Sequence, residues 1–208
     1  MTIVVHHLNN SRSQRILWLL EELGLEYEIR RYQRDAKTMF APPELRRVHP
    51  LGKSPVVEHD GRTLIETGAI AEYLVDLADG KLGAPASRDE VIRYRQFLHY
   101  AEGSLMPPLL LKLVLARLPL IGKVATERVQ PMIDTHLHWL ESELTERDWF
   151  AGDSFTVADV MMSFPLEAAQ GRAGLGSSRP RLIDWLARIH ARPAYQAALA
   201  AGGPYDYA

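Results

Sequence analysis

Hydrophobic and polar residues follow a strand, helix, strand pattern in the first thirty residues of the chain. Ile3-Val4-Val5 is a short β-branched run that predicts a buried strand. The apolar residues between positions 16 and 23 recur at helical spacing, and Gly24 is placed to end that helix. Tyr27 and Ile29 then alternate with charged residues, which indicates a second strand. The three elements together predict a βαβ unit.

A second group of strands follows an irregular segment at residues 34–52. Residues 55–58 and 63–65 read as two strands, and Asp60-Gly61 between them is a strong hairpin signal. A helix with one apolar face then runs to about Asp79. This order of elements matches a thioredoxin-like α/β domain.

The remainder of the chain has a helical pattern almost throughout. Residues 80–87 contain two glycines and a proline and read as a linker. We therefore expect an α/β domain over residues 1–79 and an all-α helical-bundle domain over residues 88–208. Pro107-Pro108 are expected to bend or restart the first long helix. Thr156 and Asp159 are spaced as a capping box at the start of a later helix.

Composition narrows the classes of protein that fit. Among 208 residues, 24 Lys and Arg balance 26 Asp and Glu, which argues against a dedicated nucleic-acid binder. The absence of cysteine excludes disulfides, Cys-ligated zinc and chemistry that needs a protein thiol. No histidine pair has metal-ligand spacing, so no metal site is expected. The first residues lack the pattern of a secretory signal, and charges and prolines interrupt the most apolar stretch, residues 105–121. A cytoplasmic protein without a membrane span is therefore expected.

Four segments, in order along nearly the whole chain, carry a resemblance to a known family. They are Ser11-Arg12-Ser13 through Gly24, His49 through Val57, Leu64 through Leu74, and the Thr156–Asp159 box with Pro180, Trp185 and Arg192-Pro193 after it. Together they resemble the soluble glutathione transferase superfamily. The first segment is most similar to a bacterial and fungal serine-type subgroup with Ser-Arg after the first strand.

The resemblance implies an enzyme in which a thioredoxin-like domain binds glutathione beside an all-helical domain. The expected reaction is attack of the glutathione thiolate on a small, apolar electrophile, as in detoxification. Glutathione is then a co-substrate, no metal takes part, and the protein is a homodimer. A glutathione-dependent peroxidase or disulfide reductase on the same fold stays open as an alternative. A non-catalytic binding or regulatory module stays open as another.

The same resemblance implies which residues of this chain bind glutathione. Pro55 is expected in the cis form, so that the main chain of Ser54 pairs with the cysteinyl part of the ligand. Glu66 and Thr67, at a strand-to-helix junction, are expected to bind the γ-glutamyl end, although a plain helix cap also explains them. Lys53 is expected at the glycyl carboxylate, or else is a solvated loop lysine.

The thiolate needs a donor, because a free thiol with a pKa of about 8.5 is little ionised at neutral pH. Ser11 aligns with the serine of serine-type relatives and is the candidate donor, with helix capping as its other explanation. Asn10 is the main rival, and a backbone amide is a further one. Other rivals close by are Asn9, Arg12, Ser13 and His7. For the second substrate, Leu105, Met106 and Leu109 are candidates to line an apolar pocket, although core packing is the favoured role for each of them.

Overall fold

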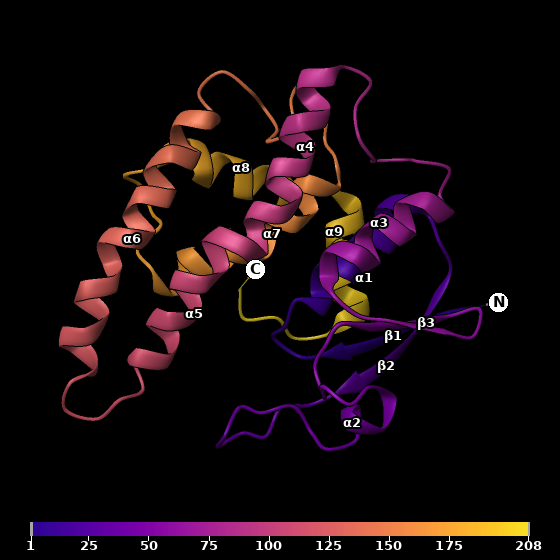
Figure 1. Ribbon diagram of the computed structural model, residues 1–208, viewed down its shortest axis with the longest axis horizontal. Helices are drawn as coiled ribbons and strands as arrows, with labels where there is room; N and C mark the ends of the chain where they lie inside the picture. Colours follow the sequence, from indigo (N-terminus) through magenta and orange to yellow (C-terminus); the bar gives the residue numbers. More distant parts are fainter. Residues whose placement is uncertain (1, 208) are drawn as a thin grey trace. The chain divides into compact units, whose positions relative to one another are not determined.

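The computed structural model describes residues 2–207, and strand β1 (Ile3–Leu8) lies in the interior of its only sheet within that range. The order of strands is β2-β1-β3-β4 (Figure 1). β2 (Tyr27–Tyr32) runs parallel to β1, whereas β3 (Val56–His59) is antiparallel to it, and β4 (Arg62–Leu64) is antiparallel to β3. The mixed sheet confirms the expected α/β class of this domain.

Two local turns have the backbone that their sequences predict. Asp60 and Gly61 have φ angles of 49° and 73°, which is the left-handed pair that a tight hairpin turn between β3 and β4 requires. Gly24 has φ 75° and its amide donates to the carbonyl of Leu20, so it ends the first helix as expected.

Because of the directions of the strands, three connecting segments lie at the same end of the sheet. β1 ends at Leu8, and β3 begins at the same end because Val56 pairs with His6. β4 ends there as well, since Leu64 pairs with Val57 in an antiparallel register. The loop after β1, the segment before β3 and the segment after β4 therefore share this end.

Three long helices accompany the sheet. α1 (Ser13–Leu23) follows β1, and α3 (Thr67–Leu77) follows β4. α9 (Pro193–Gly202) packs against α1 although the two are separated by most of the chain (Figure 1). The short helix α2 (Leu45–Val48) lies in the irregular segment.

Helix α9 belongs to the same compact unit as the sheet. This unit comprises the chain up to Gly83 together with His190–Asp206, whereas the expected boundary placed residues 88–208 in one domain. The edge of Trp18 meets the ring of Tyr195, and a β-carbon on Gly202 would lie 2.5 Å from the amide oxygen of Gln14. A larger residue at position 202 would therefore force the Gln14 side chain to shift.

The second unit, Ala84–Ile189 with Tyr207, is helical as expected. Its elements are α4 (Arg88–Tyr100), the π-helical turn η1 (Ala101–Leu105), α5 (Met106–Leu115), α6 (Gly122–Glu143), α7 (Val157–Arg172) and α8 (Pro180–His190). Pro107 and Pro108 have no amide hydrogen to give to the preceding turn, so the regular helix is interrupted before them. Among the described residues, no helix is both long and apolar enough to cross a bilayer.

The predicted capping box begins α7. The Asp159 carboxylate accepts the amide of Thr156 at 3.0 Å, and its other oxygen accepts the amide of Phe150 at 3.0 Å. Asp159 is fully buried. Burial raises the pKa of Asp159 to about 6, although these hydrogen bonds act in the opposite direction. One carboxylate thus fixes both the start of α7 and the loop that precedes it.

Replacing this carboxylate is expected to destabilise the second unit. Asp159→Ala leaves two buried amides without an acceptor, each of which costs about 1–3 kcal/mol, so a loss of roughly 2–6 kcal/mol is expected. Urea denaturation followed by tryptophan fluorescence measures it. Asp153→Ala, at an exposed position nearby, is the control and should change stability by less than about 0.5 kcal/mol. Equal midpoints for the two variants would contradict the role given to Asp159.

Candidate functional site

The loop between β1 and α1 holds Ser11 in a buried position. Its side chain is 4% exposed, and its Oγ lies 2.8 Å from the Oγ of Ser13. The amide of Ser13, the first residue of α1, donates to the Ser11 Oγ at 3.2 Å. Ser11 therefore has the capping contact that sequence offered as its second explanation, and its hydroxyl stands at the amino end of a helix, where negative charge is favoured.

Asn10, the rival of Ser11, is held by the segment after α9. Its Nδ2 donates to the Asp206 carboxylate at 2.6 Å, and its Oδ1 accepts the amide of Asp206 at 2.9 Å. The backbone of Asn10 is left-handed, with φ 50°, a conformation that asparagine tolerates better than most residues. Both functional atoms of the amide thus already have partners in unit 1.

The segment before β3 presents Ser54 at the same end of the sheet. The Ser54–Pro55 peptide bond is cis, as the resemblance implied. The hydroxyl of Ser54 donates to the carbonyl of His6 at 2.8 Å, which ties this segment to β1. Pro55 is buried and Lys53 is exposed. The main chain at Ser54 is therefore fixed, while the Lys53 ammonium projects from a solvent-exposed position.

Glu66 precedes α3 in an unusual backbone conformation. Its φ of 66° and ψ of 116° lie in a sparsely populated region for a residue with a side chain. Such a conformation costs on the order of 1–3 kcal/mol and is found preferentially at functional sites. Within residues 2–207 the Glu66 carboxylate makes no cap hydrogen bond to α3, and its side chain is exposed. Thr67, the first residue of α3, is buried.

The expected glutathione-binding residues thus reach one end of the sheet from three connections. Ser11 comes from the loop after β1, Ser54 from the segment before β3, and Glu66 from the junction after β4. The arrangement combines a carboxylate, a hydroxyl, an exposed ammonium and the amino ends of α1 and α3. These are the groups that a peptide with one ammonium, two carboxylates and a thiol needs.

Sequence reasoning missed the participants that come from the end of the described chain. A cavity of about 170 Å³ is lined by His7, Asn10, Arg31, Gly202 and Asp206, among others. His7 is 3% exposed, and its Nδ1 lies 2.9 Å from the Oγ of Ser13. The sequence had placed His7 among the rivals of Ser11, but it did not reveal that Gly202 and Asp206 line the same cavity.

The candidates for the apolar pocket are packed inside the protein. Leu105, Met106 and Leu109 are 0%, 5% and 1% exposed. Side chains with so little accessible surface have the packing role that sequence offered as their second explanation.

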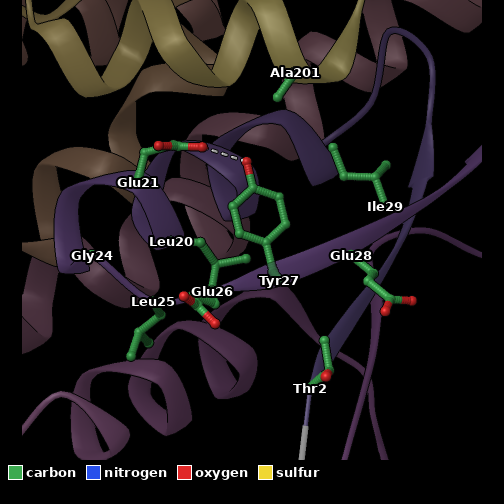
Figure 2. Close-up of a pocket in the computed structure, with 10 residues that line it drawn as sticks. All are labelled: Thr2, Leu20, Glu21, Gly24, Leu25, Glu26, Tyr27, Glu28, Ile29 and Ala201. Atoms are coloured by element: carbon green, nitrogen blue, oxygen red, sulfur yellow. Dashed lines mark hydrogen bonds between the residues drawn. The ribbon is translucent and has the colours of Figure 1, made fainter.

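A larger hollow lies at the other end of the sheet, near the start of β1 and β2. Its volume is about 790 Å³, and Figure 2 shows Glu21, Glu26 and Glu28 among the residues that line it. Tyr27 donates its hydroxyl to Glu21 at 2.6 Å, and burial raises the pKa of Tyr27. None of the expected site residues lines this hollow, and its carboxylates would repel an anionic peptide such as glutathione. We therefore assign the site to the opposite end of the sheet.

Metal ligands are not grouped in the described part of the chain. Within residues 2–207, no three His, Asp or Glu side chains converge in a way that would hold an ion. The two adjacent histidines of β1 have separate partners instead. His6 meets Tyr32 and Glu58, whereas His7 meets Ser13.

Both units match described protein families. Residues 2–76 match the family Glutathione S-transferase, N-terminal domain, and residues 123–188 match Glutathione S-transferase, C-terminal domain. Glutathione S-transferase 3 of Schizosaccharomyces pombe is 35% identical over 92% of this chain and 84% of its own length. Glutathione S-transferase 1 of Saccharomyces cerevisiae is 34% identical over 94% of this chain and 93% of its own length.

Solved structures show the same architecture. A glutathione S-transferase from Actinobacillus pleuropneumoniae has a TM-score of 0.89 and 33% identity, and the match covers 99% of this chain and 95% of that one. A sphingomonad glutathione S-transferase complexed with glutathione has a TM-score of 0.79 and 25% identity over 96% of this chain and 98% of that one.

The names of these relatives favour a transferase over the two alternatives, a peroxidase or disulfide reductase and a non-catalytic module. The match to the family domains in both units, and identity of about one third over nearly the whole length, identify this chain as a member of the glutathione S-transferase family.

Proposed function

We propose that this transferase binds glutathione at the end of the sheet formed by Ser11, Ser54 and Glu66, and transfers it to a small, apolar electrophile. The observation that carries the proposal is the convergence of three connections at this end, one of which holds Glu66 in a strained conformation. The chain has no cysteine, so the reacting thiol has to come from the ligand. The sphingomonad relative was solved with glutathione bound, which supports the same ligand here.

Each end of glutathione has a complementary group in this arrangement. The exposed Glu66 carboxylate pairs with the α-ammonium, while Thr67 and the first amides of α3 receive the neighbouring carboxylate. The main chain of Ser54 pairs with the cysteinyl residue as a short added strand. Lys53 attracts the glycyl carboxylate as a point charge.

The Ser11 hydroxyl is the donor that we propose for the thiolate. To donate to the thiolate, the Ser11 hydroxyl has to give up its neutral hydrogen bond to Ser13, which is worth about 0.5–1.5 kcal/mol. The new hydrogen bond to the thiolate is charge-assisted and is worth about 1.5–3 kcal/mol. Asn10 would have to break its bond to the Asp206 carboxylate, which is charge-assisted already. The exchange is favourable for Ser11 and close to neutral for Asn10, so Ser11 is preferred. With Ser11 as donor, we also propose that the chain belongs to the serine-type subgroup.

Further properties follow from membership of the family. We propose a cytoplasmic homodimer that conjugates reactive compounds and thereby detoxifies them. Size-exclusion chromatography with light scattering tests the dimer, which should have twice the 23.5 kDa mass of one chain.

Removing the Glu66 carboxylate is expected to weaken glutathione binding by at least about tenfold, because the ligand ammonium loses its counter-charge. Isothermal titration calorimetry with Glu66→Ala measures the affinity. Glu72→Ala provides the control, since Glu72 is an exposed carboxylate on the same helix, α3. An affinity of Glu66→Ala equal to that of the control would remove Glu66 from the site.

Substitution of Ser11 is expected to change the pKa of the glutathione thiol more than the affinity for glutathione. Ser11→Ala should raise the pKa of the bound glutathione thiol by about one unit and lower kcat roughly tenfold, with a smaller change in KM. Titration of the thiolate absorbance and steady-state kinetics with a model electrophile measure the two effects. Ser11→Thr keeps a hydroxyl and should retain most of the turnover. If Ser11→Ala keeps full turnover while Asn10→Ala abolishes it, the donor is Asn10.

A further inference from the structure

The most apolar stretch of the sequence, residues 105–121, is only partly buried in the second unit. Its beginning packs inside the helices, where Leu105, Met106 and Leu109 have almost no accessible surface. Its end forms the connection between α5 and α6, which Figure 1 shows as a turn that joins these two helices. Every residue of this connection, 116–121, is exposed. The second half of the apolar stretch therefore does not serve the core.

Large apolar side chains are grouped at this turn. Leu120 is fully exposed, and Ile121 is 60% exposed. The last turn of α5 and the first turn of α6 each add an exposed valine, and α5 packs against α6. We define the hairpin tip by five exposed residues: Val114, Leu118, Leu120, Ile121 and Val124. A contiguous apolar surface of this kind marks a place of interaction, unlike a single exposed leucine.

Backbone contacts define the shape of the hairpin tip. The amide of Gly122, the first residue of α6, donates to the carbonyl of Leu118 at 3.1 Å, and the amide of Leu118 donates to the carbonyl of Leu115 at 3.0 Å. A β-carbon on Gly122 would lie 2.9 Å from the carbonyl oxygen of Leu115, so glycine lets α6 begin close to the end of α5. Leu120 has a left-handed backbone, with φ 68°, which is uncommon for a residue with a side chain. The local fold thus presents Leu120 to the outside at some cost in strain.

The charges around the hairpin tip have one sign. Residues 103–126 contain Lys112, Arg117 and Lys123 but no Asp or Glu, whereas the whole chain has a net charge of -2. Arg117 and Lys123 are exposed and flank the apolar turn. Apolar side chains bordered by cations are typical of segments that lie in the interface of an anionic bilayer. A second copy of the tip is a poor partner, because it would bring the same cations together without a counter-charge.

We propose that the hairpin tip attaches this protein to the surface of an anionic lipid bilayer. Leu120 and Ile121 enter the boundary between headgroups and acyl chains, while Arg117 and Lys123 stay at the lipid phosphates. Attachment of this kind does not need a helix that crosses the bilayer. Apolar compounds partition into the same layer, so the attachment brings the enzyme to the class of electrophile proposed above. The attachment itself does not depend on that function.

The first test removes apolar surface from the hairpin tip. Wild-type protein should co-sediment with vesicles of phosphatidylcholine and phosphatidylglycerol in equal parts, and the double variant Leu120→Ser/Ile121→Ser should bind at least about tenfold more weakly. Both positions are exposed, so the variant is expected to fold. Ile92→Ser is the matched control, because Ile92 is 54% exposed in the same unit but lies on α4. Equal binding of wild type and the double variant overturns the proposal.

The second test removes the cations. Arg117→Ser/Lys123→Ser should weaken binding to the anionic vesicles at low salt by roughly fivefold for each cation, and added salt should reduce this difference. Arg88→Ser, at an exposed cation on α4, should bind like wild type. A loss in Arg88→Ser as large as the loss for each cation of the tip would mean that overall charge is responsible, which contradicts the proposal.

The third test locates the hairpin tip on the vesicle. Because the chain has no cysteine, a single introduced thiol can be labelled uniquely with an environment-sensitive fluorophore. The label on Leu120→Cys should shift its emission to the blue when anionic vesicles are added, whereas the label on Ile92→Cys should keep its aqueous emission. Unchanged emission at position 120 in vesicle-bound protein means that another surface binds lipid, and overturns the proposal.

A protein partner at the hairpin tip is the competing outcome. If a second copy covers the tip, Leu120→Ser/Ile121→Ser should lower the mass measured by light scattering without lipid, and wild type should not bind vesicles. That result overturns attachment to a bilayer, whereas equal masses together with vesicle binding support it. None of these measurements uses glutathione, so failure of this proposal is distinguishable from failure of the proposed function.

Discussion

The position of β1 inside the sheet is the constraint on which the candidate site depends. β1 buries Ile3, Val5 and Leu8, and it pairs with a parallel strand on one side and an antiparallel strand on the other. This pairing, together with the antiparallel pairing of β4 with β3, brings the ends of β1 and β4 and the start of β3 to the same end of the sheet. The proposed binding groups come together there because each one follows or precedes a strand whose register is fixed.

Most elements of the fold were predictable because their signals are local. The Asp60-Gly61 turn, the Gly24 helix end and the Thr156–Asp159 capping box each depend on a few adjacent residues, and all three are present. The packing of α9 on α1 was not predictable. No periodic pattern identifies which helix covers which, and the close approach at Gly202 depends on Gln14, far away in sequence.

In the candidate site, too, some residues were predictable from local motifs, whereas others depend on contacts between distant parts of the chain. Ser54, Pro55, Glu66 and Thr67 stand in short motifs that a resemblance can transfer, and the topology places them at one end of the sheet. The partners of Ser11 and Asn10 belong to tertiary structure. Asp206 holds Asn10 across 196 positions, and Ser11 reaches His7 only through Ser13. The resemblance ranked Ser11 above Asn10, but the sequence contained no information about the hydrogen-bond partners of either residue.

The position of α9 late in the chain also determines the order in which the two units are completed during synthesis. Apart from Tyr207, the second unit is formed by the uninterrupted stretch Ala84–Ile189, which the ribosome completes before it makes α9. The sheet and α1 are therefore without their last helix while that stretch is translated, for roughly 5–20 s at usual rates of synthesis. During this interval the apolar surface that α9 will cover is open to chaperones. The first unit to be translated is thus the last to be completed.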